Sequence, residues 1–288
     1  MFAWLADQRA SVGETLTRRA LSDFSIEGRR VSLIGPQGIW KPAVCELPIS
    51  IATTTRGPYS DTFNDADGTL RYSYRGTDPG DRDHRDNVGL RRAMSLRVPV
   101  VYFHAVEPGV YVAAWPVFVV ADDRVGMTFT MQVDDAAAAF LTNASSYPMR
   151  DDATDARRAY ITRSVRQRLH QVAFRERVIR AYHQRCALCS LRHQELLDAA
   201  HITPDSDPDG EPIVTNGVAL CKLHHAAFDR LFFAIRPDYI VEVRPSILLE
   251  SDGPMLAVGL QQIHDRRIIL PRRTSDMPDP RRLEKRYA

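Results

Sequence analysis

Short apolar stretches separated by turn residues fill most of the first half of the chain. Between residues 31 and 135, segments rich in valine, isoleucine, tyrosine and phenylalanine alternate with glycine, proline and aspartate, which is typical of strands joined by tight turns. The segments are RVSLIG, LPISIATTT, LRYSYRG, VPVVYFHAV and VYVAAWPVFVV. One stretch between them, HRDNVGLRRAMSLR, has the spacing of a short helix. This pattern predicts a β-barrel or a strongly curved sheet with a helix or two.

A long helical pattern opens the second half. From 136 to 160 an alanine run gives way to polar residues and a proline, which indicates a domain boundary. Ser164 and Gln167 then match a capping box, a signature of a helix start, and apolar residues recur at helical spacing as far as Tyr182. We therefore expect an α+β protein in four parts. These are a first domain over 1–140, a linker over 141–163, a second domain over 164–271 and a charged, extended tail over 272–288.

Size and composition are those of a globular protein. A chain of 288 residues can form two ordinary domains. No apolar run reaches the ~18 residues that would cross a membrane. The first residues, MFAWLADQRA, lack the basic segment, apolar run and cleavage site of a secretory leader. We expect a cytoplasmic protein without a membrane partner.

The distribution of charge says more than the net charge, which is only +2. From Arg157 to Arg185 there are nine arginines and one acid, Glu176. Such a basic stretch fits a local anionic partner such as a DNA backbone, and makes Arg166 and Arg175 candidate DNA contacts. The alternative is a charged helix whose arginines only face water.

Three of the four cysteines belong to two chelating pairs. Cys186 and Cys189 form one pair, and Cys221 and His224 form another about thirty residues later. A two-residue gap lets both members of a pair reach one ion, and zinc prefers four nitrogen or sulfur ligands in a tetrahedron. With four protein ligands such an ion has no open position for water, so it would have a structural role. Cys45 is left over and is expected to be a buried thiol.

The residues between and after these pairs resemble the HNH nuclease family, also called the ββα-metal fold. Three stretches over roughly 170–240 carry the resemblance, namely DAAHITP, TNGVALC and LHHAAFD. The family has a histidine on the first strand of a hairpin, an asparagine at the hairpin loop and a histidine on the following helix. Members with a zinc knuckle carry flanking cysteine pairs of this kind. The resemblance implies a zinc-stapled nuclease domain.

Hydrolysis of a phosphodiester needs a base, a cation that stabilises the developing charge, and a group that orients the base. A histidine that is neutral near pH 7 suits the base. The resemblance implies that His201 is this base, that Asn216 constrains the hairpin, and that His225 binds one divalent cation, Mg²⁺ or Mn²⁺. Many members carry a second metal ligand immediately before the base, where this chain has Ala200. The candidates for a second ligand are Asp229, four residues after His225 on the same helix face, and Asp198.

The first half resembles the SRA (YDG) family, a PUA-like β-barrel domain that binds modified cytosine after flipping it out of the duplex. The matching order over roughly 30–135 is GPYSDTF, then LRYSYRG, then DNVGLRRA before VPVVYF. A flipped base needs flat walls and a polar group that reads its edge. The resemblance implies that Tyr59 and Tyr74 are the walls and that Asp61 accepts from the cytosine amine. The alternative is that these tyrosines are ordinary core or surface residues.

Together these patterns predict a modification-dependent DNA endonuclease. The first domain would hold 5-methyl- or 5-hydroxymethylcytosine of double-stranded DNA, and the second would cut nearby. Cutting both strands requires two active sites, so we expect a homodimer. Two alternatives remain: an HNH endonuclease whose first domain reads another modification or DNA feature, and a non-catalytic zinc-knuckle DNA-binding protein.

Overall fold

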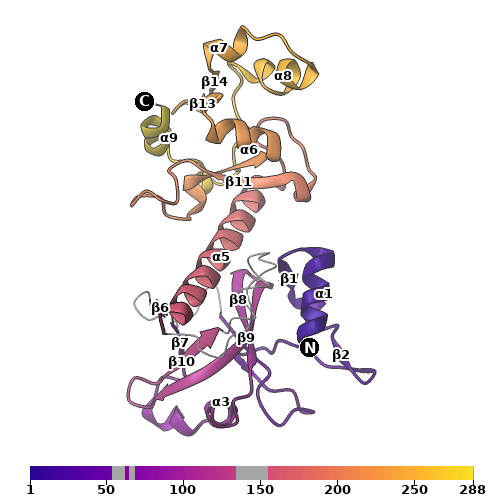
Figure 1. Ribbon diagram of the computed structural model, residues 1–288, viewed down its shortest axis with the longest axis vertical. Coiled ribbons are helices and arrows are strands. Elements are labelled where there is room, and N and C mark those ends of the chain that lie inside the picture. The colour runs from indigo at the N-terminus through magenta and orange to yellow at the C-terminus, as the bar shows by residue number, and fades with distance from the viewer. Residues whose placement is uncertain (54–61, 65–68, 134–154, 288) are drawn as a thin grey trace. The chain divides into compact units, whose positions relative to one another are not determined.

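The structure is a computed structural model that describes residues 1–53, 62–64, 69–133 and 155–287, with side chains for all of these except 62–64 and 155–163. The chain divides into two compact units, Met1–Val172 and Ala173–Ala288. Each unit is described by itself below (Figure 1). No helix among the described residues is both long and apolar enough to cross a membrane.

Unit 1 is built on one mixed sheet of eight strands, curled into a half-barrel (Figure 1). The strand order is β4-β5-β8-β9-β10-β7-β6, with β1 added beside β9. All described pairs are antiparallel except β5 with β8. The strands are β1 (Thr15–Thr17), β4 (Ile39–Trp40), β5 (Ser50–Ala52), β6 (Thr62–Asn64), β7 (Thr69–Ser73), β8 (Val100–Glu107), β9 (Val110–Asp123) and β10 (Thr128–Val133).

The predicted β-rich half is confirmed, with two differences. RVSLIG contributes only its first residue to a strand, in the small hairpin of β2 (Ser25–Ile26) and β3 (Arg29–Arg30). The rest of this segment still lies in the core, because Leu33 and Ile34 are buried without strand pairing. Among the described residues the two ends of the strand order, β4 and β6, do not pair with each other, so the sheet is half a barrel and not a closed one.

Before β8, the described part of this unit contains the helices α1 (Phe2–Val12), α2 (Arg18–Leu21) and α3 (Arg85–Ser95). The last confirms the helix predicted from HRDNVGLRRAMSLR. The fully buried Asn87 fixes its start, since its side chain accepts from the amide of Arg75 and donates to the carbonyls of Arg75 and Asp81. One asparagine thus satisfies three backbone groups of the turn that follows β7.

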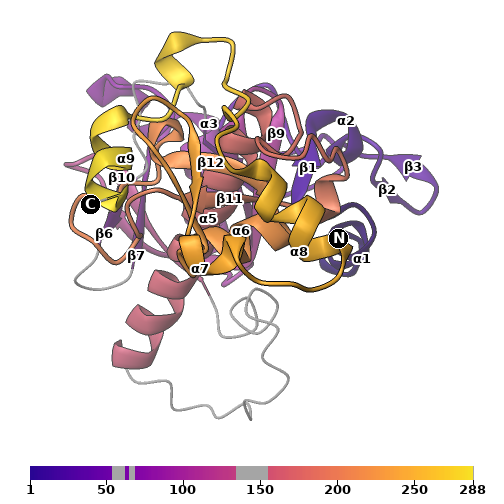
Figure 2. The ribbon, with the colours of Figure 1, turned by 90° about the horizontal axis from the view of Figure 1, so that it is seen from above.

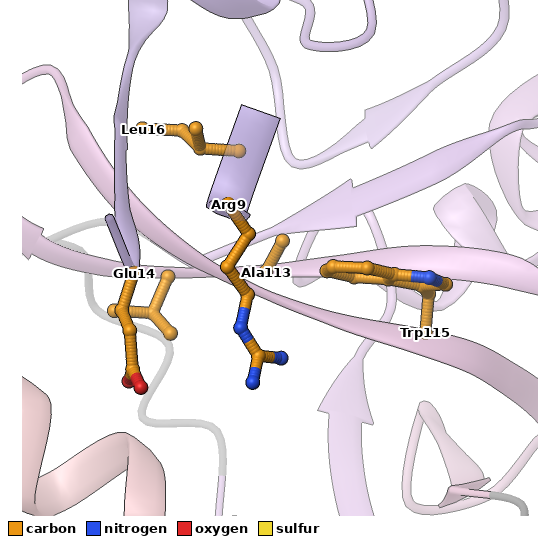
Figure 3. A pocket seen from close by; sticks show the side chains of 6 residues that line it. Arg9, Glu14, Leu16, Ala113 and Trp115 are labelled. Carbon is orange, nitrogen blue, oxygen red and sulfur yellow. The ribbon is translucent and has the colours of Figure 1, made fainter. Parts of the chain in front are cut away.

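A small pocket of unit 1 lies where α1 and β1 meet β9 (Figure 3). Figure 3 shows the Arg9 side chain extending between Glu14 and Trp115. The pocket is lined by Arg9, Glu14, Leu16, Val112, Ala113 and Trp115, and so does not include Tyr74.

Unit 2 is built around a hairpin and a short helix, which lie side by side in Figures 1 and 2. Strands β11 (Leu197–His201) and β12 (Gly217–Cys221) pair antiparallel, and α6 (Lys222–Asp229) follows directly. The C-terminal part of α5 (Asp155–Ala181) packs on this hairpin through Phe174 and Val178. The remaining elements are β13 (Phe233–Ile235), β14 (Val241–Val243), α7 (Pro245–Leu248), α8 (Pro254–Gly259) and α9 (Pro280–Tyr287).

Two sequence-based expectations for this half are wrong. Helix α5 begins at Asp155, so Ser164 lies inside the helix and not at its start, and the last residues assigned to the linker are helical. The segment from 272 is not an extended tail, because it ends in α9, whose Leu283 is 1% exposed in the core of unit 2. Burial of this leucine gives a strongly charged helix its apolar contact with the core, which the composition of the segment did not indicate.

Candidate active site

The hairpin and the helix after it place the three predicted catalytic residues on one small element. His201 ends β11, Asn216 immediately precedes β12, and His225 lies in the first turns of α6. Because His201 pairs with Gly217, the asparagine lies next to the partner of the base. The predicted strand, strand and helix are therefore present in the order that the resemblance implies.

His201 combines partial burial with an unused nitrogen. Its ring stacks on Phe174, with centroids 4.1 Å apart and planes 20° apart. Its Nε2 is buried and has no hydrogen-bond partner among the described residues. Burial lowers the pKa of His201 below its ordinary value, although Asp205 opposes the shift. A neutral imidazole with a free nitrogen can accept a proton.

Gly217 permits this stacking. A Cβ at position 217 would lie 2.5 Å from Val178 and 2.8 Å from Phe174, closer than carbon atoms approach in proteins. Any side chain here would therefore push α5 away from the hairpin and remove the face on which His201 rests. The glycine of the TNG triplet could have indicated this close approach of α5, since glycine within a strand often marks a place where another element comes close.

Asn216 is fully buried and connects both ends of the hairpin loop. Its Oδ1 accepts from the amide of Thr203 at 2.8 Å, and its Nδ2 donates to the carbonyls of Thr203 and Glu211 at 3.1 and 3.0 Å. Its own carbonyl accepts from the amide of Ile202, the residue after the base. The side chain therefore has a constraining position, as expected from the resemblance.

His225 lies between two carboxylates that face different ring nitrogens. Its Nδ1 is 3.3 Å from Oδ2 of Asp198, and its Nε2 is 3.2 Å from Oδ2 of Asp229. The contact with Asp198 raises the pKa of His225, against the effect of burial. Although burial opposes it, the bonds from His225 and Lys222 hold the pKa of Asp198 well below its usual range. The sequence did not indicate Lys222, whose Nζ donates to Asp198 at 2.9 Å.

The four predicted zinc ligands converge. The ligand atoms of Cys186, Cys189, Cys221 and His224 all lie within 4.8 Å of one another. The Sγ atoms of Cys189 and Cys221 are 3.9 Å apart, close to the ~3.8 Å expected for two sulfurs at about 2.3 Å from a tetrahedral zinc. The Nδ1 of His224 is 3.1 Å from Sγ of Cys221 and 3.4 Å from Sγ of Cys186. The donor set and its spacing fit a zinc ion, so this cluster could bind one.

The other nitrogen of His224 is also engaged. Its Nε2 is 2.7 Å from the carbonyl oxygen of Gly259, at the end of α8. A proton on Nε2 that is donated to this carbonyl leaves Nδ1 free as the ligand atom, which is the usual arrangement around zinc-binding histidines. No local sequence signal could have indicated Gly259, which lies 35 residues further along the chain.

Of the two arginines predicted to contact DNA, Arg175 has partners within unit 2. It donates to the carbonyls of Gln194 and Leu197 at 2.8 and 2.9 Å and to Glu176 at 2.9 Å. It thereby supports the start of β11. Arg166 is partly exposed on α5. DNA contact by either residue stays a prediction.

The predicted base pocket is described only in part, since Tyr59 and Asp61 lie outside the described residues. Tyr74 is 2% exposed and donates its hydroxyl proton to Asp122. Its ring lies 4.6 Å from that of Phe129 between centroids, and the guanidinium of Arg91 lies 5.4 Å from its centroid. Stacking of a base on Tyr74 stays a prediction, and it would require one of these neighbours to move.

Comparison with protein families agrees with this geometry. Residues 186–236 match a family model described as HNH endonuclease, a range that contains the zinc cluster and all three predicted catalytic residues. A solved structure described as a modification-dependent TagI restriction endonuclease is similar at 16% identity and a TM-score of 0.29, over 83% of this chain and 80% of that one. Comparison with curated proteins finds no match. Residues 186–236 therefore form an HNH endonuclease domain, and the enzyme is an HNH-type DNA endonuclease.

Proposed function

We propose that this endonuclease cuts double-stranded DNA that carries a modified cytosine, 5-methyl- or 5-hydroxymethylcytosine. The proposed cleavage is supported by one observation above all, the position of His201, whose ring stacks on Phe174 at the end of β11, the strand that α6 with its His225 and Asp229 contacts. An imidazole stacked on Phe174 with a free nitrogen is built to accept a proton. A residue that served only the zinc staple would need no such nitrogen.

In this mechanism His201 takes the proton from the water that attacks the phosphorus. Stacking on Phe174 fixes the plane of the ring, and Asn216 fixes the strand that carries it. The position of the imidazole before the reaction matters, because a misplacement of a catalytic group by about 1 Å can lower the rate by a factor of about 10². A bound Mg²⁺ or Mn²⁺ supplies the positive charge that stabilises the developing negative charge on the phosphate.

Asp229 and His225 are the residues that would hold this ion. Oδ2 of Asp229 and Nε2 of His225 lie 3.2 Å apart, and Asp229 is half exposed, so both atoms can face one solvated cation. Mg²⁺ commonly keeps several waters and takes only one or two protein carboxylates, which agrees with a site of few ligands. Asp198 lies on the Nδ1 side, where it orients the ring of His225 instead of binding the ion.

The proposed recognition of modified cytosine is supported by the order of the motifs in unit 1 and by its curved sheet. GPYSDTF, LRYSYRG and the α3 segment follow one another as in the SRA (YDG) family. The buried Asn87 at the start of α3 fixes the turn after β7, so the motif residues that are described have defined positions. We further propose a homodimer, since one HNH site cuts one strand.

The cleavage rate should fall in acidic solution because His201 becomes protonated there. The imidazole accepts a proton only when neutral, so the rate should fall as the pH drops through its pKa. Because burial lowers that pKa below the ordinary value of 6.5, the rate should be constant through neutral pH and fall only in more acidic solution. Single-turnover rates at saturating metal between pH 5 and 9 measure this. A rate that fell already between pH 8 and 7 would contradict the assignment.

The choice of substrate is tested with one plasmid in three forms, unmodified, 5-methylated and 5-hydroxymethylated, incubated with Mg²⁺ or Mn²⁺. Wild type should cut a modified form at least about tenfold faster than the unmodified one. Tyr59→Ala, which removes a proposed wall of the base pocket, should bring the three rates together, whereas His201→Ala should abolish all of them. Equal cutting of all three forms by wild type would remove the modified base from the proposal and leave an endonuclease that reads another feature.

A further inference from the structure

The last helix of the chain contacts both halves of the active site through one side chain. Arg286, on α9, donates from Nη1 to the carbonyl oxygens of His201 and Ile202 at 3.2 and 2.9 Å. From Nη2 it donates to the carbonyl of Phe228 at 3.0 Å. The first carbonyl belongs to His201, the last residue of β11, and the second to the residue after it. The third lies at the end of α6, next to Asp229.

The surroundings hold this guanidinium in one place. The side chain of Arg286 is 14% exposed, and its guanidinium carbon lies 3.9 Å from the centroid of the Phe228 ring. Its Nη2 is also 3.8 Å from Oδ1 of Asp229. Leu283, one turn earlier in α9, is buried in the core of unit 2 and anchors the helix. A buried planar fork with three backbone acceptors can fix the distance between two elements in a way that a flexible ammonium cannot.

We infer that Arg286 is a positioning residue for phosphodiester hydrolysis, which sets the distance between the base His201 and the metal-binding Asp229. The inference rests on the proposed roles of these two residues. Arg286 itself touches no reacting atom, because its donors are directed at backbone carbonyls. It lies outside residues 186–236, which match the HNH family, so the chain supplies this contact from a segment beyond the nuclease motif.

The test uses the full chain with Arg286→Ala, Arg286→Lys and a control, Lys285→Ala. Lys285 is the neighbouring cation on α9, and its contacts with Asp207 and Asp209 are exposed and do not reach His201. The control thus removes one positive charge from the same helix. Three quantities are measured: the single-turnover rate constant for plasmid cleavage, the DNA concentration at half-saturation, and the ¹⁵N signals of the His201 and His225 imidazoles.

Arg286→Ala should lower the rate constant about 10²-fold and change the half-saturating DNA concentration by less than about threefold. It should also shift the His201 imidazole signals. Arg286→Lys should recover the rate only in part, because the single nitrogen of an ammonium cannot occupy the positions of both Nη1 and Nη2. Lys285→Ala should behave as wild type. An unchanged rate for Arg286→Ala would overturn the inference. So would a loss confined to the half-saturating concentration, which would indicate a phosphate contact.

Folding is checked by thermal unfolding of each variant. If Arg286→Ala does not fold, Arg286→Lys decides in the same way: a reduced rate in a folded protein supports the inference, and a wild-type rate overturns it. If wild type cuts no form of DNA, the proposed function fails by itself. The imidazole signals then decide the position of Arg286, since signals that Arg286→Ala leaves unmoved would overturn its positioning role.

Discussion

Replacing His201 by alanine is expected to lower the rate of DNA cleavage by a factor of about 10²–10⁴, the range that general-base catalysis contributes. The reason is that no other described group at this position combines a neutral imidazole with a free buried nitrogen. DNA binding should be unchanged, because the ring is partly buried against Phe174 and carries no charge at neutral pH. Single-turnover cleavage and a separate binding measurement distinguish the two effects.

The control for this variant is His193→Ala, which removes an exposed histidine of the same unit outside the site. It should cut at the wild-type rate. His201→Gln adds a second comparison, since it keeps a planar polar group against Phe174 but cannot act as a base near neutral pH. A His201→Ala protein that folds and still cuts within a few fold of wild type would show that another group activates the water.

Removing the zinc ligands should have the largest effect on stability. Structural zinc contributes about 10–16 kcal/mol of binding free energy in zinc-finger peptides, as much as the ~5–15 kcal/mol that holds a typical domain folded. Cys186→Ser, or removal of the ion by a chelator, should therefore abolish cooperative unfolding of unit 2 and cleavage with it. The cluster connects the chain before β11 to the start of α6, so its loss releases His201 from His225.

Zinc content by atomic absorption and thermal unfolding by circular dichroism measure this expectation. One zinc per chain is expected for wild type and for Cys45→Ser, the matched control, because Cys45 is a free, half-buried thiol in unit 1 outside the cluster. A Cys186→Ser protein with the wild-type unfolding transition would contradict a structural role for the ion. So would wild-type protein that unfolds normally with no bound metal.

The sequence alone determined the nuclease element because its information is local. Two-residue gaps bring Cys186 to Cys189 and Cys221 to His224 whatever the rest of the chain does, and the apolar residues around His201 indicate a strand. The resemblance to the HNH family also rests on short segments, and it implied the order of base, asparagine and helical histidine on a hairpin and a helix. The curved sheet of unit 1 and α3 were predictable for the same reason.

Local patterns gave a misleading picture where a distant contact decides the structure. Ser164 matched a helix start, but α5 begins at Asp155, because one capping motif is only one of many signals along a long helix. The charged segment from 272 offered few apolar residues, yet the buried Leu283 and the hydrogen bonds of Arg286 dock α9 on a core that other segments build. Tyr74 matched a pocket motif and is packed against Arg91 and Phe129, so its role as a wall of the base pocket stays a prediction.

The sequence thus predicted the candidate catalytic residues, whereas the orientation of their side chains was decided only by the tertiary structure. Spacing placed both Asp198 and Asp229 near His225, but only the fold assigns them to opposite nitrogens of its ring. Spacing gave no sign of Arg286, which reaches His201 across 85 residues of sequence. The physical reason is that a chelating gap or a hydrophobic period acts over a few residues, whereas the direction of a side chain depends on every element packed around it.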